Sequence, residues 1–346
     1  MLKKHISLAL CGIGAVAMLS GCYTGGPVPV KNSTPTAAEG DIKTGLAVVI
    51  DLSGSAAPSD GKDGAGKTVF TAAAVLVDSQ GTILSCDLDT LEASVNFSAE
   101  GKITSDLTLP FQTKGEKGDN YNMKGASPIQ KEWYEQAEAF CNYVVGKTAE
   151  EVSGIPLDEG GKTTDADLAA GCTISIPSFV QAVVEATENA TARGAAEGDA
   201  ISIGISASAS DSKDAGDEDG AVELAATFVA VSMDEGGIFT SGYADSVETT
   251  VNFTATGEIT TDLTAPVVSK YDKKESYNMK SISPIQKEWY EQADGFCTFL
   301  KGRTMTQVSD AMYNGSATPA DLAATCTINT NGLMDATSKA AARMSE

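Results

Sequence analysis

One long segment occurs twice in the chain, and this internal repeat limits the folds that the chain can adopt. Residues 121–141 match residues 277–297 at 17 of 21 positions, with an offset of 156. A second stretch, 95–110, matches 251–266 at 11 of 16 positions with the same offset. A single period of this length corresponds to a domain rather than to one unit of a solenoid. The sequence therefore predicts a tandem duplication.

We predict an α+β fold in which each copy is an antiparallel sheet followed by helices, with one domain at 44–192 and the other at 197–346. Alternating and β-branched apolar residues predict three strands per copy, at 46–52, 69–77 and 94–103 and at 201–205, 222–231 and 249–259. A capping box with proline at the first helical position, Ser127 to Gln130, then predicts a helix that buries Trp133. Further helices are expected at 178–187 and 332–341.

The first residues are typical of a bacterial lipoprotein. Lys3 and Lys4 precede an apolar run at 6–19, which is too short for a permanent membrane span, and the tetrapeptide ending at Cys22 resembles a lipobox. We therefore predict a lipoprotein signal peptide at 1–21, a lipid on Cys22 and a flexible tether at 22–43, with the protein at the extracellular face of the cell membrane. The alternative is a cleaved secretory signal with a chance cysteine.

Charge and composition exclude several classes of function. The net charge of −23 repels nucleic acid and anionic lipid headgroups, so we expect neither as a direct partner. The one histidine, His5, lies in the predicted signal, which leaves the mature chain without a histidine-based metal site or catalytic triad.

A second motif, D-L-A-A-x-C-T, also occurs twice, from Asp167 to Thr173 and from Asp321 to Thr327. It resembles the acceptor motif of covalently flavinylated proteins, in which a flavin transferase attaches FMN to the threonine through a phosphoester bond. The resemblance implies two covalent FMN groups, on Thr173 and Thr327. It also implies that Asp167 and Asp321 shape the turn or orient the hydroxyl. The alternative is a structural turn that is shared only because the chain duplicated.

The longer repeated segment, Y-N-M-K-x-x-S-P-I-x-K-E-W-Y-E-Q, resembles the flavin lipoproteins of bacterial extracellular electron transfer, also called pheromone lipoproteins. This resemblance covers nearly the whole mature chain. It implies an electron carrier rather than an enzyme, which takes electrons from a membrane quinone-linked donor and passes them to extracellular acceptors such as ferric iron. Two alternatives lack flavin: a surface lipoprotein that binds a solute or partner, and a pheromone precursor.

Repeated aromatic, sulfur and basic residues are the candidates for contacts with such a flavin. They are Tyr121, Met123 and Lys124 in the first copy and Tyr277, Met279 and Lys280 in the second. Aromatic rings can stack on the isoalloxazine, and lysine can pair with its phosphate or with its reduced anion. Trp133 is interpreted mainly as a core residue, because it lies on the apolar face of its helix.

The cysteines allow two interpretations. Export into oxidising surroundings favours disulfides, and we expect Cys141–Cys172 and Cys297–Cys326, each of which would clamp the threonine turn onto a helix. Cys86 has no cysteine at its counterpart position and is expected to stay free. The alternative is two buried thiols in each copy.

Overall fold

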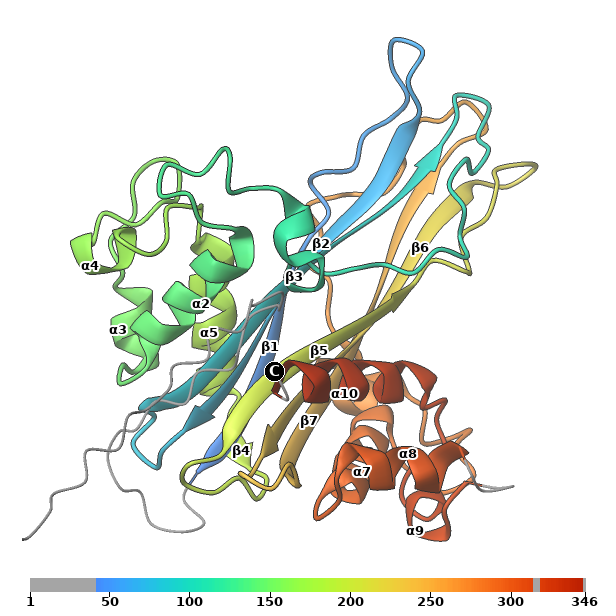
Figure 1. Ribbon diagram of the computed structural model, residues 1–346. Coiled ribbons are helices and arrows are strands. Elements are labelled where there is room, and N and C mark those ends of the chain that lie inside the picture. The colour runs from blue at the N-terminus through green and yellow to red at the C-terminus, as the bar shows by residue number, and fades with distance from the viewer. Residues whose placement is uncertain (1–41, 314–317, 345–346) are drawn as a thin grey trace, which may run out of the picture.

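Two antiparallel sheets packed against each other form the centre of the protein (Figure 1). The structure is a computed structural model, and it describes residues 42–313 and 318–344. The predicted signal peptide, almost all of the tether and Cys22 lie outside these residues. Every helix in the described part is too short or too polar to cross a membrane.

The first sheet has the strand order β3-β2-β1-β4 and the second the order β5-β6-β7. All paired strands are antiparallel, which confirms the predicted α+β class. The strands of the first sheet are β1 (Lys43–Asp51), β2 (Gly64–Val77), β3 (Ile83–Phe97) and β4 (Thr191–Ala192). Those of the second are β5 (Ala200–Ser208), β6 (Gly220–Met233) and β7 (Phe239–Phe253).

Helices follow the strands in the same order in both halves of the chain. The first half has α1 (Lys114–Lys117), the 3₁₀ helix η1 (Gly118–Tyr121), α2 (Trp133–Val144), α3 (Ala149–Ser153), α4 (Ala166–Ala169) and α5 (Pro177–Glu188). The second half has α6 (Lys270–Lys273), the 3₁₀ helix η2 (Lys274–Tyr277), α7 (Trp289–Leu300), α8 (Met305–Tyr313), α9 (Ala320–Ala323) and α10 (Asn331–Met344). The two sets of helices lie on opposite sides of the packed sheets (Figure 1).

Alternating side chains of the strands in the first sheet contribute to two different cores. In β2, Ala72 and Ala74 point into the core between the sheets, whereas Ala73 and Val75 pack against the helices of the first half. Burial on both faces explains the nearly continuous apolar run at the end of this strand. Trp133 and Phe140 of α2 and Phe179 of α5 fill the helix-facing core.

The core between the sheets joins the two halves into one body. The rings of Phe97 and Phe253, which are equivalent residues of β3 and β7, stack with their centroids 4.1 Å apart. Phe70 and Phe228 approach to 5.7 Å nearby. Because removal of this apolar surface from water stabilises both halves at once, the two predicted domains share one hydrophobic core.

Glycines let the long helices approach the sheets closely. A Cβ on Gly45 of β1 would lie 1.9 Å from the carbonyl oxygen of Ala186 in α5. Gly204 of β5 stands in the same relation to Ala336 in α10, also at 1.9 Å. Either glycine-to-alanine change would therefore push a helix away from its sheet.

Several predicted boundaries are wrong. The third strand runs over 83–97 rather than 94–103, and its counterpart in the second half runs over 239–253 rather than 249–259, because most of each strand alternates polar and apolar residues that are buried on both faces. The helix predicted from Ser127 begins at Trp133 instead, since Gln130 has φ +53° and Glu132 provides the N-cap. A capping box from Thr148 to Glu151 does form, at the start of α3.

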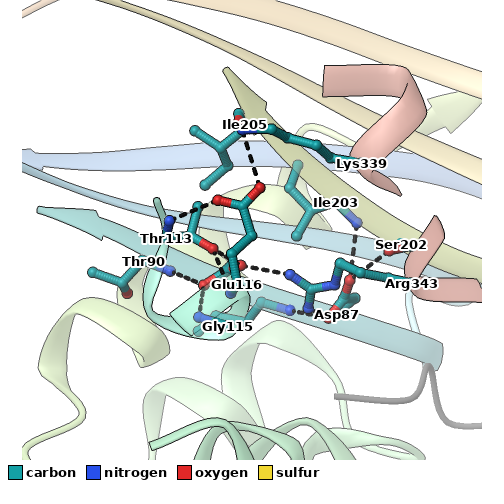
Figure 2. A network of polar contacts seen from close by, with 12 residues as sticks. Asp87, Thr90, Thr113, Gly115, Glu116, Ser202, Ile203, Ile205, Lys339 and Arg343 are labelled. Atoms are coloured by element: carbon teal, nitrogen blue, oxygen red, sulfur yellow. Dashed lines mark hydrogen bonds and ion pairs between the residues drawn. The ribbon is translucent and has the colours of Figure 1, made fainter. Parts of the chain in front are cut away.

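A buried ionic network fixes the orientation of the two halves (Figure 2). Arg343 of α10 donates to Asp89 and to Asp87 of β3, each at 2.6 Å. Asp87 also accepts hydrogen bonds from the hydroxyl of Ser202 and the N–H of Ile203 in β5, both at 2.9 Å. A strand of the first half is thereby tied to a strand and a helix of the second.

Candidate functional site

A buried glutamine holds each motif threonine in place. Gln136 of α2 is fully buried, and its side-chain oxygen accepts hydrogen bonds from the backbone N–H of Thr173 at 2.9 Å and from its hydroxyl at 3.1 Å. The amide nitrogen of Gln136 donates to the hydroxyl of Ser127 at 3.3 Å and to the carbonyl of Lys131 at 3.1 Å. One side chain therefore joins the threonine turn to the loop before α2.

The second half repeats this arrangement. The side-chain oxygen of Gln292 accepts from the N–H of Thr327 at 2.8 Å and from its hydroxyl at 3.0 Å. Its amide nitrogen donates to Ser283 and to the carbonyl of Lys287, both at 3.1 Å. Thr173 is partly exposed and Thr327 is exposed, so neither threonine is buried in the core.

A glutamate holds the backbone of the repeated Y-N-M-K loop. The carboxylate of Glu132 accepts from the N–H groups of Met123 at 2.8 Å and Lys124 at 2.9 Å, and Glu132 is almost fully buried. The N–H of Glu132 in turn donates to the carboxylate of Glu135, which completes a capping box at the start of α2. The carboxylate of Glu132 thus holds the backbone of the loop in place.

A cavity of about 420 Å³ opens beside Thr173, within the size range of small-molecule and cofactor sites. Its walls combine apolar and aromatic side chains with hydroxyl and amide groups and two lysines. The lining residues are Val69, Thr71, Thr90, Lys114, Met123, Ala126, Ser127, Pro128, Trp133, Gln136, Lys162, Thr173, Ile174, Ser175, Ser178 and Phe179. Such walls suit a planar aromatic ligand with polar edges.

An equivalent cavity of about 470 Å³ lies beside Thr327. Nine of its lining residues occupy the positions of residues that line the first cavity, namely Val69, Thr71, Thr90, Lys114, Trp133, Ile174, Ser175, Ser178 and Phe179; they are Ala225, Thr227, Ser246, Lys270, Trp289, Ile328, Asn329, Gly332 and Leu333. The other residues of its lining, which include Glu248 and Asp335, have no counterpart in the lining of the first cavity. Two pockets of one design therefore occur, each next to a motif threonine.

Lys114 and Lys270 supply positive charge to the two pockets. The ammonium of Lys114 lies 2.8 Å from the carboxylate of Glu92, and that of Lys270 lies 2.5 Å from Glu248. Burial opposes ionisation of Glu92, but the hydrogen bonds and charges of Lys114 and Lys67 outweigh it and lower the pKa of the carboxyl. The carboxylate of Glu92 is therefore ionised at neutral pH and pairs with Lys114.

The predicted residues of the first half are brought together in part. Thr173 and Met123 line the same cavity. Tyr121 lies beside it, with the ammonium of Lys114 5.3 Å from its ring centre. Lys124 is exposed, and Asp167 is exposed on α4, where its N–H bonds to Asp165.

In the second half, Tyr277 lies near its pocket, with the ammonium of Lys270 5.5 Å from its ring centre. Met279 is held by Gln292, whose amide nitrogen lies 3.4 Å from its sulfur. Lys280 is exposed. Asp321 forms an ion pair with Arg303 at 2.7 Å, which fixes the start of the motif turn.

Several pocket residues were not singled out from the sequence. Gln136, Gln292, Glu132 and Glu288 lie inside the repeated segment, and their identity in both copies was the signal that could have found them. Lys114 and Lys270 share the offset of 156 but lie outside the matched segments, where nothing distinguishes them from surface lysines.

The predicted disulfides Cys141–Cys172 and Cys297–Cys326 are not formed. The five cysteines of the described residues are free and buried. Cys141 instead makes a side-chain hydrogen bond with Cys86, on the neighbouring strand β3. Burial raises the pKa of the Cys172 and Cys326 thiols to about 11, so both are protonated and weakly nucleophilic at neutral pH.

We expect five free thiols in the chain that begins at residue 23, because the structure pairs none of the five described cysteines. The measurement is thiol titration in denaturant without reductant. A count of three, with Cys86 and Cys141 in one cross-linked peptide, would show instead that these neighbours oxidise in the exported protein. Cross-links from Cys141 to Cys172 or from Cys297 to Cys326 would contradict the structure.

Comparison of the chain with protein-family models, with curated proteins and with solved structures gave no significant match. Within the described residues, no group of three or more histidine, cysteine, aspartate or glutamate side chains is placed to hold a metal ion. The functional argument therefore depends on the two pockets and on the motifs beside them.

Proposed function

We propose that the chain is a lipid-anchored, extracellular electron carrier with two covalent FMN groups, one on Thr173 and one on Thr327. The observation that carries this proposal is the pair of equivalent cavities, each beside a motif threonine that a buried glutamine holds in place. The resemblance of the repeated segments to extracellular flavin lipoproteins supports the same assignment.

The pocket beside Thr173 suits a flavin in four respects. Trp133 and Phe179 offer apolar surface to a planar ring system, and Lys114 offers positive charge. Ser127, Ser175 and Ser178 offer hydroxyl groups to polar edges. A group attached to the Thr173 hydroxyl would start at the wall of this cavity, because Thr173 itself lines it.

The protein's own residues would hold and tune the cofactor. When bound, FMN supplies the reversible uptake of one or two electrons. Gln136 positions the acceptor hydroxyl but, as a neutral amide, cannot remove its proton, so activation of the hydroxyl falls to a flavin transferase. Electrons would come from a quinone-linked donor in the membrane and leave to extracellular acceptors such as ferric iron.

Removal of either threonine tests the proposal. In cells that also make a flavin transferase, the intact mass of the purified protein should show two FMN groups, Thr173→Ala should retain one, and Thr327→Ala should retain the other. The double variant should be colourless. Thr164→Ala is a matched control, because Thr164 is an exposed threonine on the loop before the motif and should leave both FMN groups in place.

A colourless wild-type protein from those cells would overturn the proposal. It would favour a surface module that binds a soluble ligand in the same cavities.

A further inference from the structure

The two pockets share one design but differ in their charge. Among the residues that the structure describes, the pocket beside Thr173 is lined by Lys114 and Lys162 and by no carboxylate. The pocket beside Thr327 is lined by Lys270 together with Glu248 and Asp335. The lining side chains therefore carry positive charge in the first half and net negative charge in the second.

The residues just behind the linings increase this difference. Lys67 of β2 lies 3.3 Å from Glu92, so that Glu92 is shared between Lys67 and Lys114. The fourth residue of β6, at the position of Lys67, is Glu223. An ion pair of the first half is thus replaced in the second by two glutamates, Glu223 and Glu248.

Compensation by neighbouring charges reduces the difference without removing it. The ammonium of Lys339 lies 3.6 Å from Asp335, and it also lies 3.0 Å from Glu116 of the first half. Lys162 is exposed, so water screens its charge. The exchange of Lys67 for Glu223 remains, at equivalent and partly buried positions.

Charge next to a flavin changes its reduction potential. Reduction adds electrons to the isoalloxazine, and a nearby positive charge stabilises the reduced form more than the oxidised form, whereas a negative charge does the opposite. The effect is strengthened where the ring is shielded from water.

From these charges we propose that a flavin in the Thr173 pocket has a higher reduction potential than one in the Thr327 pocket. In a partly reduced protein, the electrons then reside mainly in the Thr173 pocket. This inference rests on the proposed function. When one pair of electrons is present, a flavin in the Thr327 pocket would be oxidised and a flavin in the Thr173 pocket would be reduced. The accompanying protons would exchange with the solvent. The electrons come from an external donor such as a quinol. The Thr327 pocket is then the entry side and the Thr173 pocket the exit side of the carrier.

The test uses the two single-threonine variants, each of which carries one flavin. The midpoint potential of each variant is measured by spectroelectrochemical titration at low salt. Thr327→Ala, which keeps the flavin of Thr173, should have the higher potential. Adding Lys67→Glu to Thr327→Ala should lower the potential of the flavin on Thr173. Adding Glu223→Lys to Thr173→Ala should raise the potential of the flavin on Thr327. Both changes should therefore reduce the difference between the two potentials. Because the two charge changes are made in separate backgrounds, either one suffices if the other variant does not fold.

Lys62→Glu is the control. It makes the same charge change at the exposed tip of the loop between β1 and β2 and should leave both potentials unchanged. Equal potentials, a reversed order, or a shift with Lys62→Glu as large as that with Lys67→Glu would overturn the inference while leaving the flavin assignment in place. Absence of flavin from both single-threonine variants would instead overturn the proposed function.

Discussion

Replacement of Arg343 by methionine should destabilise the protein by about 3–5 kcal/mol, the range measured when one partner of a buried ion pair is removed. Arg343 donates to Asp87 and Asp89, which are both buried, and methionine would fill similar space without satisfying either carboxylate. The free energy of unfolding from denaturant titration at pH 7 is the measurement.

A matched control separates this effect from a general loss of positive charge. Arg303 pairs with Asp321 on the surface, and Arg303→Met should cost no more than about 1 kcal/mol because water screens the exposed pair. Equal effects of the two substitutions would contradict the assigned role of Arg343.

The loss of stability caused by Arg343→Met should also depend on pH. Burial raises the pKa of Asp87, although Arg343 counteracts that rise. Without Arg343 the carboxyl can avoid an unpaired buried charge by taking up a proton, so the loss of stability should shrink as the pH falls. Asp87→Asn in the Arg343→Met background should recover part of the stability at pH 7, since an amide oxygen can still accept from Ser202 and Ile203.

The repeated pattern made the class and the equivalent positions predictable. Because Trp133 and Trp289 lie at the same place in the repeat, as do the two motif threonines, the sequence alone indicates that they occupy corresponding sites in the two halves. The apolar helix face of Trp133 is buried, as its periodicity predicted. Local patterns of this kind report burial reliably because each residue's own neighbours set the period.

Long-range partners were not predictable from these patterns. Asp87 and Asp89 interrupt the apolar pattern of β3, and the arginine that pairs with both, Arg343, comes from the end of the chain. The third strand was therefore predicted too late in the sequence.

Two further predictions, the start of the helix at Ser127 and the cysteine pairing, are wrong for reasons that the sequence pattern does not show. Gln130 adopts a positive φ that a helix forbids, so the sequence from Ser127 only resembles a capping box. Cys141 was paired with Cys172 because both repeat in the second half, whereas its actual neighbour, Cys86, has glycine as its counterpart. A pattern that compares the halves cannot reveal a contact that occurs in one half alone.

Asp245→Asn should make the protein more stable at pH 8, by about 2–4 kcal/mol, and should have a smaller stabilising effect at pH 5. Asp245 of β7 is buried, and its carboxylate accepts from the N–H groups of Ser246 at 2.7 Å and Tyr271 at 2.9 Å. Burial raises its pKa to about 7, which these hydrogen bonds only partly counteract.

The sign follows from proton binding. Between about pH 4 and pH 7 the folded protein keeps a proton on Asp245 that the unfolded chain has released. The free energy of unfolding therefore falls as the pH rises through this window, and the loss is complete once Asp245 is ionised in the folded state. Asparagine keeps the acceptor oxygen and carries no charge, so it removes this loss.

The equivalent residue in the first half is a control with the opposite sign. Asp89 occupies the position of Asp245 but binds Arg343, so Asp89→Asn should destabilise the protein at pH 8 by leaving the guanidinium with one carboxylate fewer. Denaturant titrations of both variants and the wild type from pH 5 to pH 8 give the comparison. A difference between Asp245→Asn and the wild type that does not vary with pH would show that Asp245 is not protonated in the folded protein, and that its pocket solvates the charge better than its burial indicates.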